Sequence, residues 1–89
     1  MSDVSGSFVV ECFWPEVKEA DLRLLDRRIR DALNTVDGPE VRYLGSILMC
    51  DDEVVLCQFE GDPAAVRAAA QRAEVPFARI LRTTRLPIP

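Results

Sequence analysis

The alternation of apolar and polar residues over SFVVECF, residues 7–13, predicts a β-strand that ends before Pro15. One face of this strand is uniformly apolar and carries Phe8, Val10 and Cys12. The other face is apolar apart from one carboxylate and carries Val9, Glu11 and Phe13. Burying an unpaired carboxylate under a helix is costly, so we expect the face with Glu11 to be the uncovered one.

Apolar residues then recur at helical spacing over residues 19–36, which predicts a helix ended by the turn Asp37-Gly38-Pro39. The apolar stripe consists of Leu22, Leu25, Ile29, Ala32, Leu33 and Val36. The opposite face is rich in arginine, and Asp26 is spaced to pair with Arg30 one turn later. Such a face is more often solvated than used to bind an acidic partner.

Two β-rich runs flank the acidic triplet Asp51-Asp52-Glu53 and predict a hairpin over residues 41–60. In the second run Val55, Cys57 and Phe59 form the apolar set that should face the helices. Leu56, Gln58 and Glu60 should then lie beside Glu11 on the uncovered face. The first run is apolar on both sides, so its pattern does not decide which face Tyr43 takes.

A second helix is predicted over residues 63–74, with Asp62 as its N-cap and Pro63 at its first position. Pro76 ends this helix, and residues 77–84 read as a last strand.

The predicted order is strand, helix, strand, strand, helix, strand. Right-handed crossovers place both helices on one face of a four-stranded antiparallel sheet, with the first and third strands central. We therefore predict an α+β, ferredoxin-like βαββαβ domain over residues 7–85, with a disordered tail at 1–6 and a C-terminal tail at 86–89. Helices cover only one face, and the other is too apolar to leave in water. This predicts a homodimer of the dimeric α+β barrel type, in which two sheets pack face to face.

Such an interface encloses a cavity, and its lining gives the predicted ligand-binding residues: Glu11, Phe13, Tyr43, Ser46, Gln58 and Glu60. A carboxylate in a partly apolar cavity suits a general acid or base, which makes Glu11 the catalytic residue if the protein is an enzyme. The alternative is that Glu11 pairs with Arg42 or Arg79 and serves the structure of the dimer.

The charge balance narrows the class of partner. Eleven basic and fifteen acidic residues give a net charge of −4, which argues against a nucleic-acid partner.

No apolar run is long enough for a membrane span, and the polar start MSDVSGS lacks the pattern of a signal peptide. The three cysteines, at positions 12, 50 and 57, have no CxxC spacing. We therefore expect reduced thiols and a cytoplasmic protein.

The pieces VVECFWP, VRYLGSILMCDDEVVLCQFEGDP and AAQRAEVPFARI, in this order, resemble a family of small bacterial ferredoxin-like proteins of unknown function, sometimes labelled nickel-binding. The resemblance covers roughly residues 8–81 and implies the same fold, a dimer and, where the label applies, a bound nickel ion. Family members usually have Arg and then Tyr or His after the first-strand Glu, where this chain has Cys12 and Phe13. The chain has no histidine, so a metal would be held by ligands from Cys12, Cys50, Cys57, Glu11, Glu60 or residues 51–53.

Two functions follow as hypotheses. The first is a homodimeric protein that binds a small ligand or a metal ion in the cavity between its sheets. The second is a cofactor-independent enzyme of the cyclase, isomerase or monooxygenase type, with Glu11 as acid or base. The second hypothesis rests on fold-level analogy. No nucleophile-and-base pair and no glycine-rich phosphate loop is visible, and the sequence does not identify the ligand or substrate.

Overall fold

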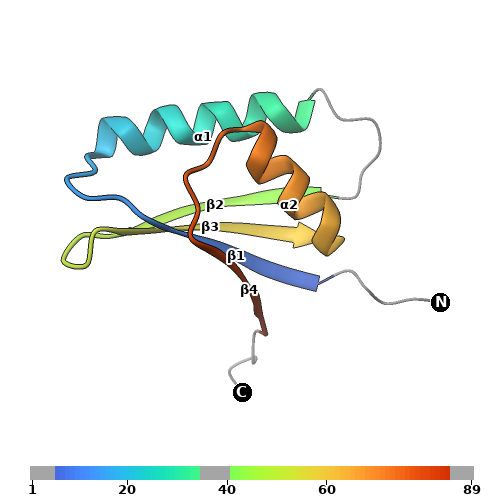
Figure 1. Ribbon diagram of the computed structural model, residues 1–89. Helices are drawn as coiled ribbons and strands as arrows, with labels where there is room; N and C mark the ends of the chain where they lie inside the picture. The colour runs from blue at the N-terminus through green and yellow to red at the C-terminus, as the bar shows by residue number, and fades with distance from the viewer. Residues whose placement is uncertain (1–5, 35–40, 85–89) are drawn as a thin grey trace, which may run out of the picture.

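The computed structural model describes residues 6–34 and 41–84 and shows the predicted order of elements (Figure 1). The elements are β1 (Gly6–Phe13), α1 (Glu19–Asn34), β2 (Val41–Met49), β3 (Val54–Gly61), α2 (Pro63–Arg72) and β4 (Arg79–Thr83). The strands form one antiparallel sheet in the order β2-β3-β1-β4, so β1 and β3 are central. This confirms the ferredoxin-like α+β fold. Gly6 was predicted in the N-terminal tail but is the first residue of β1. Residues 1–5, the tail at 86–89, Val36 and the turn at 37–39 lie outside the described residues.

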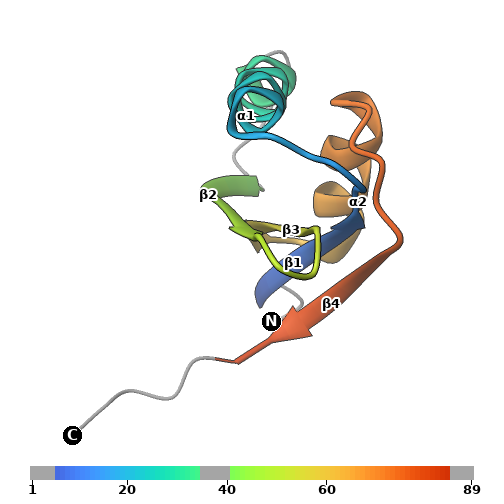
Figure 2. The same cartoon turned by 90° about the vertical axis from the view of Figure 1, so that its left-hand side faces the viewer.

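Both helices lie on the same side of the sheet, with α1 above β2 and α2 nearer β1 (Figures 1 and 2). Alternate residues of the central strands are buried under them, as the pattern predicted. Leu25 and Ile29 of α1 and Val66 of α2 meet this layer and are fully buried. The strand side of this core consists of Phe8, Val10, Cys12, Val55, Cys57 and Phe59.

The two helices are tied together by one arginine. The guanidinium of Arg28 on α1 donates hydrogen bonds to the carbonyl oxygens of Ala73 and Glu74, each at 3.0 Å. These carbonyls lie at the C-terminal end of α2, where helix carbonyls have no partner within the helix. At the other end of α2, the Asp62 carboxylate accepts from the Ala65 N–H at 3.1 Å, which confirms Asp62 as the N-cap.

The acidic turn between β2 and β3 holds the loop that follows β1. The Trp14 N–H donates to the Glu53 carbonyl at 2.9 Å, and the Glu16 N–H donates to the Glu53 carboxylate at 2.8 Å. Glu53 of the triplet Asp51-Asp52-Glu53 therefore has a structural role, while Asp51 and Asp52 are exposed. No helix in the described part of the chain is long and apolar enough to cross a membrane.

Candidate functional site

The strand register places side chains of the uncovered face in rows that run across the sheet. The central row consists of Ile47, Leu56, Glu11 and Arg79. The next row consists of Gly45, Gln58, Val9 and Leu81. Glu11 therefore lies where the sequence predicted, on the face without helices and among apolar neighbours.

Glu11 does not stand alone on this face, because Arg79 lies opposite it on β4 and forms an ion pair with it. The Glu11 side chain is 24% exposed and the Arg79 side chain 64% exposed, so the carboxylate is the partly buried partner. The hydrogen bond to Glu11 raises the pKa of Arg79 above its ordinary value. This is the structural alternative foreseen for Glu11, with Arg79 rather than Arg42 as the partner.

Arg42 pairs instead with Glu60 at 3.3 Å, directly opposite on β3. Glu60 lies four residues along β3 from Leu56, the residue opposite Glu11. At the rise of an extended strand, four residues correspond to about 13 Å. Glu11 and Glu60 thus belong to two separate ion pairs on one face rather than to one cluster of carboxylates.

Gln58 lies in the row next to that of Glu11, and it borders an open space on the side of the edge strand β2. Its neighbour on β2 is Gly45, whose φ of 117° is in the region that favours glycine. A side-chain carbon added at Gly45 would meet no atom within 4 Å. Phe13 lies at the end of β1 on the same face and is 62% exposed. Glu11, Arg79, Gln58 and Phe13 therefore line one continuous area, to which Ile47 and Leu56 add apolar surface.

Tyr43 and Ser46 do not belong to this area, which corrects the predicted site. Tyr43 is opposite Phe59 and Ser46 is opposite Cys57, and both of these β3 residues are buried under the helices. A β-bulge between Tyr43 and Gly45 shifts the register and puts both side chains on the helix side of the sheet. The sequence left the face of Tyr43 open because this run is apolar on both sides, and the bulge shows that regular alternation would also have failed here.

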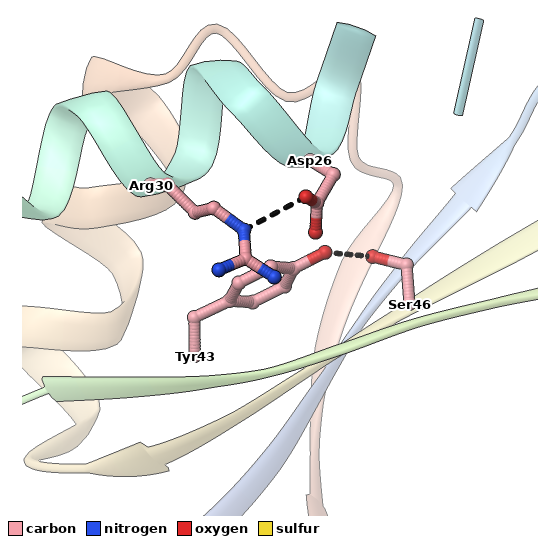
Figure 3. A network of polar contacts seen from close by, with 4 residues as sticks. All are labelled: Asp26, Arg30, Tyr43 and Ser46. Carbon is pink, nitrogen blue, oxygen red and sulfur yellow. Dashed lines mark hydrogen bonds and ion pairs between the residues drawn. The ribbon is translucent and has the colours of Figure 1, made fainter. Parts of the chain in front are cut away.

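On the helix side, Tyr43 and Ser46 form a polar network with α1 (Figure 3). The two hydroxyl groups are 2.6 Å apart, and the Arg30 guanidinium lies over the Tyr43 ring, 5.9 Å from its centroid. Arg30 in turn donates to Asp26 at 2.8 Å, the predicted pair one helical turn apart. Burial raises the pKa of the Tyr43 hydroxyl, so it stays protonated.

A groove of about 640 Å³ runs along this side of α1 and reaches Ser46. Its lining contains basic and acidic residues in equal number: Glu19, Arg23, Asp26, Arg27, Arg30 and Asp31. The lining therefore has no net charge. Two of its three arginines form ion pairs within α1, Arg23 with Glu19 and Arg30 with Asp26. This lining was not predicted as a site, although the i,i+4 spacing of its charges is visible in the sequence.

The cysteines are not arranged for metal binding together with Glu11. Cys12 and Cys57 are fully buried on the helix side of the sheet, and Cys50 is exposed in the turn after β2. The hydrogen bond with Cys57, together with burial, raises the pKa of the Cys12 thiol. Within residues 6–34 and 41–84, no group of three or more His, Cys, Asp or Glu side chains is placed to hold a metal ion.

Comparison with known proteins adds no relative: no family model matches the chain, and no curated protein or solved structure matches it significantly. The resemblance to the small bacterial family stays a prediction.

Proposed function

We propose that this protein is a homodimer that binds a small organic molecule between two sheets packed face to face. The observation that carries the proposal is the composition of the uncovered face. It combines exposed Phe13 and Ile47 with Leu56 and a partly buried ion pair at its centre. An apolar area of this kind marks an interaction surface.

A second copy is the occupant that the charges favour. The two arginines that face outward from the sheet, Arg42 and Arg79, are each paired with a glutamate of the same face. The face is therefore neutral, and two copies can approach without net repulsion. A nucleic acid or another highly charged partner would find no unpaired charge of one sign to bind on this described face.

The groups left free on this face suggest the chemistry of the ligand. Arg79 uses its Nε to bind Glu11, so its two terminal nitrogens can donate to an acceptor oxygen. The Gln58 amide can donate and accept beside the space at Gly45. Phe13 and Leu56 offer apolar contacts. We therefore expect an amphipathic ligand with an apolar body and a carboxylate or carbonyl oxygen.

The ion pair between Glu11 and Arg79 is also the reason why we propose ligand binding rather than catalysis. In the alternative function, a cofactor-independent enzyme, Glu11 would transfer a proton to or from the substrate. Arg79 forms an ion pair with this carboxylate and occupies one of its oxygens. This contact suits a group that positions Arg79 for a ligand better than a group that exchanges protons with a substrate.

Metal binding, the other form of the first hypothesis, has less support. Nickel favours imidazole and thiolate ligands, and this chain has no histidine. The buried Cys12 and Cys57 face away from Glu11, since they lie on the opposite side of the sheet. The ligands that this chain offers therefore fit nickel poorly.

The test is native mass spectrometry on tag-free protein, before and after incubation with nickel, zinc and copper, followed by a thermal-shift screen of small organic acids and ketones. We expect a dimer that takes up an organic molecule, with binding at least about tenfold weaker in Arg79→Met, where charged hydrogen bonds are lost. Arg72→Met, a change of the same kind on an exposed residue of α2, is the control. A monomer, or a ligand bound equally well by Arg79→Met, would contradict the proposal.

A further inference from the structure

The two edges of the sheet differ in the way they resist pairing with another strand. The β4 edge is only five residues long and carries Arg79, Arg82 and Thr83. Short, charged edges are the usual protection against pairing. The β2 edge is nine residues long, has no proline or lysine, and carries Arg42 as its one charge. β2 is therefore an unprotected edge.

The exposed apolar residues lie mainly on this edge strand. Leu44, Ile47 and Met49, all on β2, are 39–46% exposed. A bulge disturbs the start of the strand, between Tyr43 and Gly45, but the register from Gly45 to Met49 is regular. This stretch offers unpaired backbone groups and apolar side chains together, which is the arrangement that accepts an added strand.

The charges at the two ends of β2 indicate which strand is added. Arg42 lies at the start of β2, and the exposed carboxylates of Asp51 and Asp52 lie in the turn at its end. In an antiparallel pair of identical strands, the start of one copy lies beside the end of the other. Arg42 of each copy would then lie beside the acidic turn of the other copy, and the two-fold symmetry gives two such contacts. A parallel pair would instead bring Arg42 next to its own copy.

We propose that β2 pairs antiparallel with β2 of a second copy, about a two-fold axis at Ile47. This residue is the middle of the regular stretch Gly45–Met49. It is also equally distant in sequence from Arg42 and Asp52, so this register brings Arg42 of each copy to the end of the pair where the acidic turn of the other copy lies. The neighbouring groove along α1 is neutral, and its internal ion pairs let two copies of α1 approach without net repulsion.

The edge contact can be tested apart from the face-to-face contact in the proposed function. Arg42 and Ile47 belong to both surfaces, whereas Asp52 lies in the turn at the end of β2 and Leu56 lies on the uncovered face. The two-fold axis of the edge contact is perpendicular to the sheet and that of the face contact is parallel to it, so a closed assembly of four copies satisfies both contacts. Variants that break one contact leave two copies, and variants that break both leave one.

The experiment is size-exclusion chromatography with light scattering on single charge reversals and on their mixture. Arg42→Glu and Asp52→Arg each replace two attractive pairs by repulsive ones, so we expect the edge contact to weaken by about tenfold or more and the mass to halve. In an equimolar mixture, a chain with Arg42→Glu can pair with a chain with Asp52→Arg. Opposite charges then face each other at both ends of the paired strands, so the mixture regains the mass of the natural protein. Arg72→Glu, which makes the same change of net charge on α2 as Arg42→Glu, leaves the mass unchanged.

Leu56→Asp separates the two proposals, because it places a charge in the face-to-face contact and leaves the β2 edge intact. If it halves the mass and Asp52→Arg does not, the edge contact is wrong and the face contact holds. If Asp52→Arg halves the mass and Leu56→Asp does not, the edge contact holds and the face contact fails. A monomeric natural protein, or a variant mixture that does not regain the larger mass, overturns the edge contact. Circular dichroism of each variant confirms that it is folded.

Discussion

Glu11 and Arg79 face each other across β1 and β4 and form an ion pair in which the acid is the more buried partner. Removing the charge of Arg79 and removing the charge of Glu11 should therefore lower the stability of the protein by different amounts. Arg79→Met leaves the Glu11 carboxylate charged and without this partner beside Leu56, whereas Glu11→Gln leaves an arginine that reaches water. We expect Arg79→Met to lower the urea midpoint more than Glu11→Gln does.

A double-mutant cycle with both variants isolates the interaction from other effects of each change. The coupling should be favourable and should shrink at high salt, since the arginine is exposed. Equal losses for the two single variants, or a coupling that salt does not change, would contradict this account of the pair.

Arg28 is expected to contribute more to stability than Arg27, its neighbour on α1, since Arg28 bonds to the end of α2. Arg28→Met removes two hydrogen bonds to the carbonyls of Ala73 and Glu74 and should lower the free energy of unfolding by about 1–2 kcal/mol. Arg27→Met is the matched control, because Arg27 is exposed on the same helix, and it should change stability by less than about 0.5 kcal/mol. Urea denaturation measures both, and similar losses in the two variants would contradict the role of Arg28.

Much of the fold could be predicted because several local signals agree. The order of elements follows from the change between twofold and helical periodicity, and Asp62-Pro63 gives the start of α2. The position of Glu11 follows from a single physical cost, that of burying a carboxylate under a helix. The boundaries are less exact: residues 77 and 78 were predicted in the last strand, but β4 begins at Arg79.

The candidate site could be predicted only in part, and the reason is the bulge in β2. A strand that is apolar on both sides gives no alternation to read, and the bulge at Tyr43/Gly45 then changes which side successive residues take. Tyr43 and Ser46 were therefore grouped with Glu11, from which the sheet separates them. The partner of Glu11 was also undetermined, because the predicted topology brings both Arg42 and Arg79 to the same sheet and does not choose between them.

The Tyr43 hydroxyl should make stability sensitive to alkaline pH. Burial raises its pKa above the ordinary value of 10.0, so the folded protein keeps this proton where the unfolded chain loses it. The stabilisation is complete below about pH 10 and is lost as the pH rises from there toward the folded-state pKa.

Tyr43→Phe tests the contribution of this hydroxyl group. The variant loses the hydrogen bond to Ser46, which should cost about 0.5–1.5 kcal/mol at neutral pH. Its free energy of unfolding should then fall less steeply than that of the natural protein above about pH 10. Urea denaturation at a series of pH values measures the difference, and parallel curves for the two proteins would show that the Tyr43 pKa is not raised.

Glu74 is expected to be a position where glycine is better than the natural residue. The Val75 N–H donates to the Ala70 carbonyl and the Glu74 N–H to the Gln71 carbonyl, each at 3.0 Å, which forms a Schellman motif at the end of α2. This motif requires a left-handed residue at Glu74, whose φ is 60°, and a side chain with a Cβ is strained there. The Glu74 side chain is exposed, so little contact is lost on its removal.

Glu74→Gly should therefore raise the free energy of unfolding by about 0.5–1 kcal/mol, after allowing for the greater freedom of glycine in the unfolded chain. Glu74→Ala is the control, since it removes the same side-chain atoms beyond Cβ but keeps the strain, and it should leave stability nearly unchanged. The glycine variant keeps the backbone carbonyl at position 74 that accepts from Arg28, so the contact between the helices is preserved. If the alanine variant is as stable as the glycine variant, the gain does not come from backbone strain.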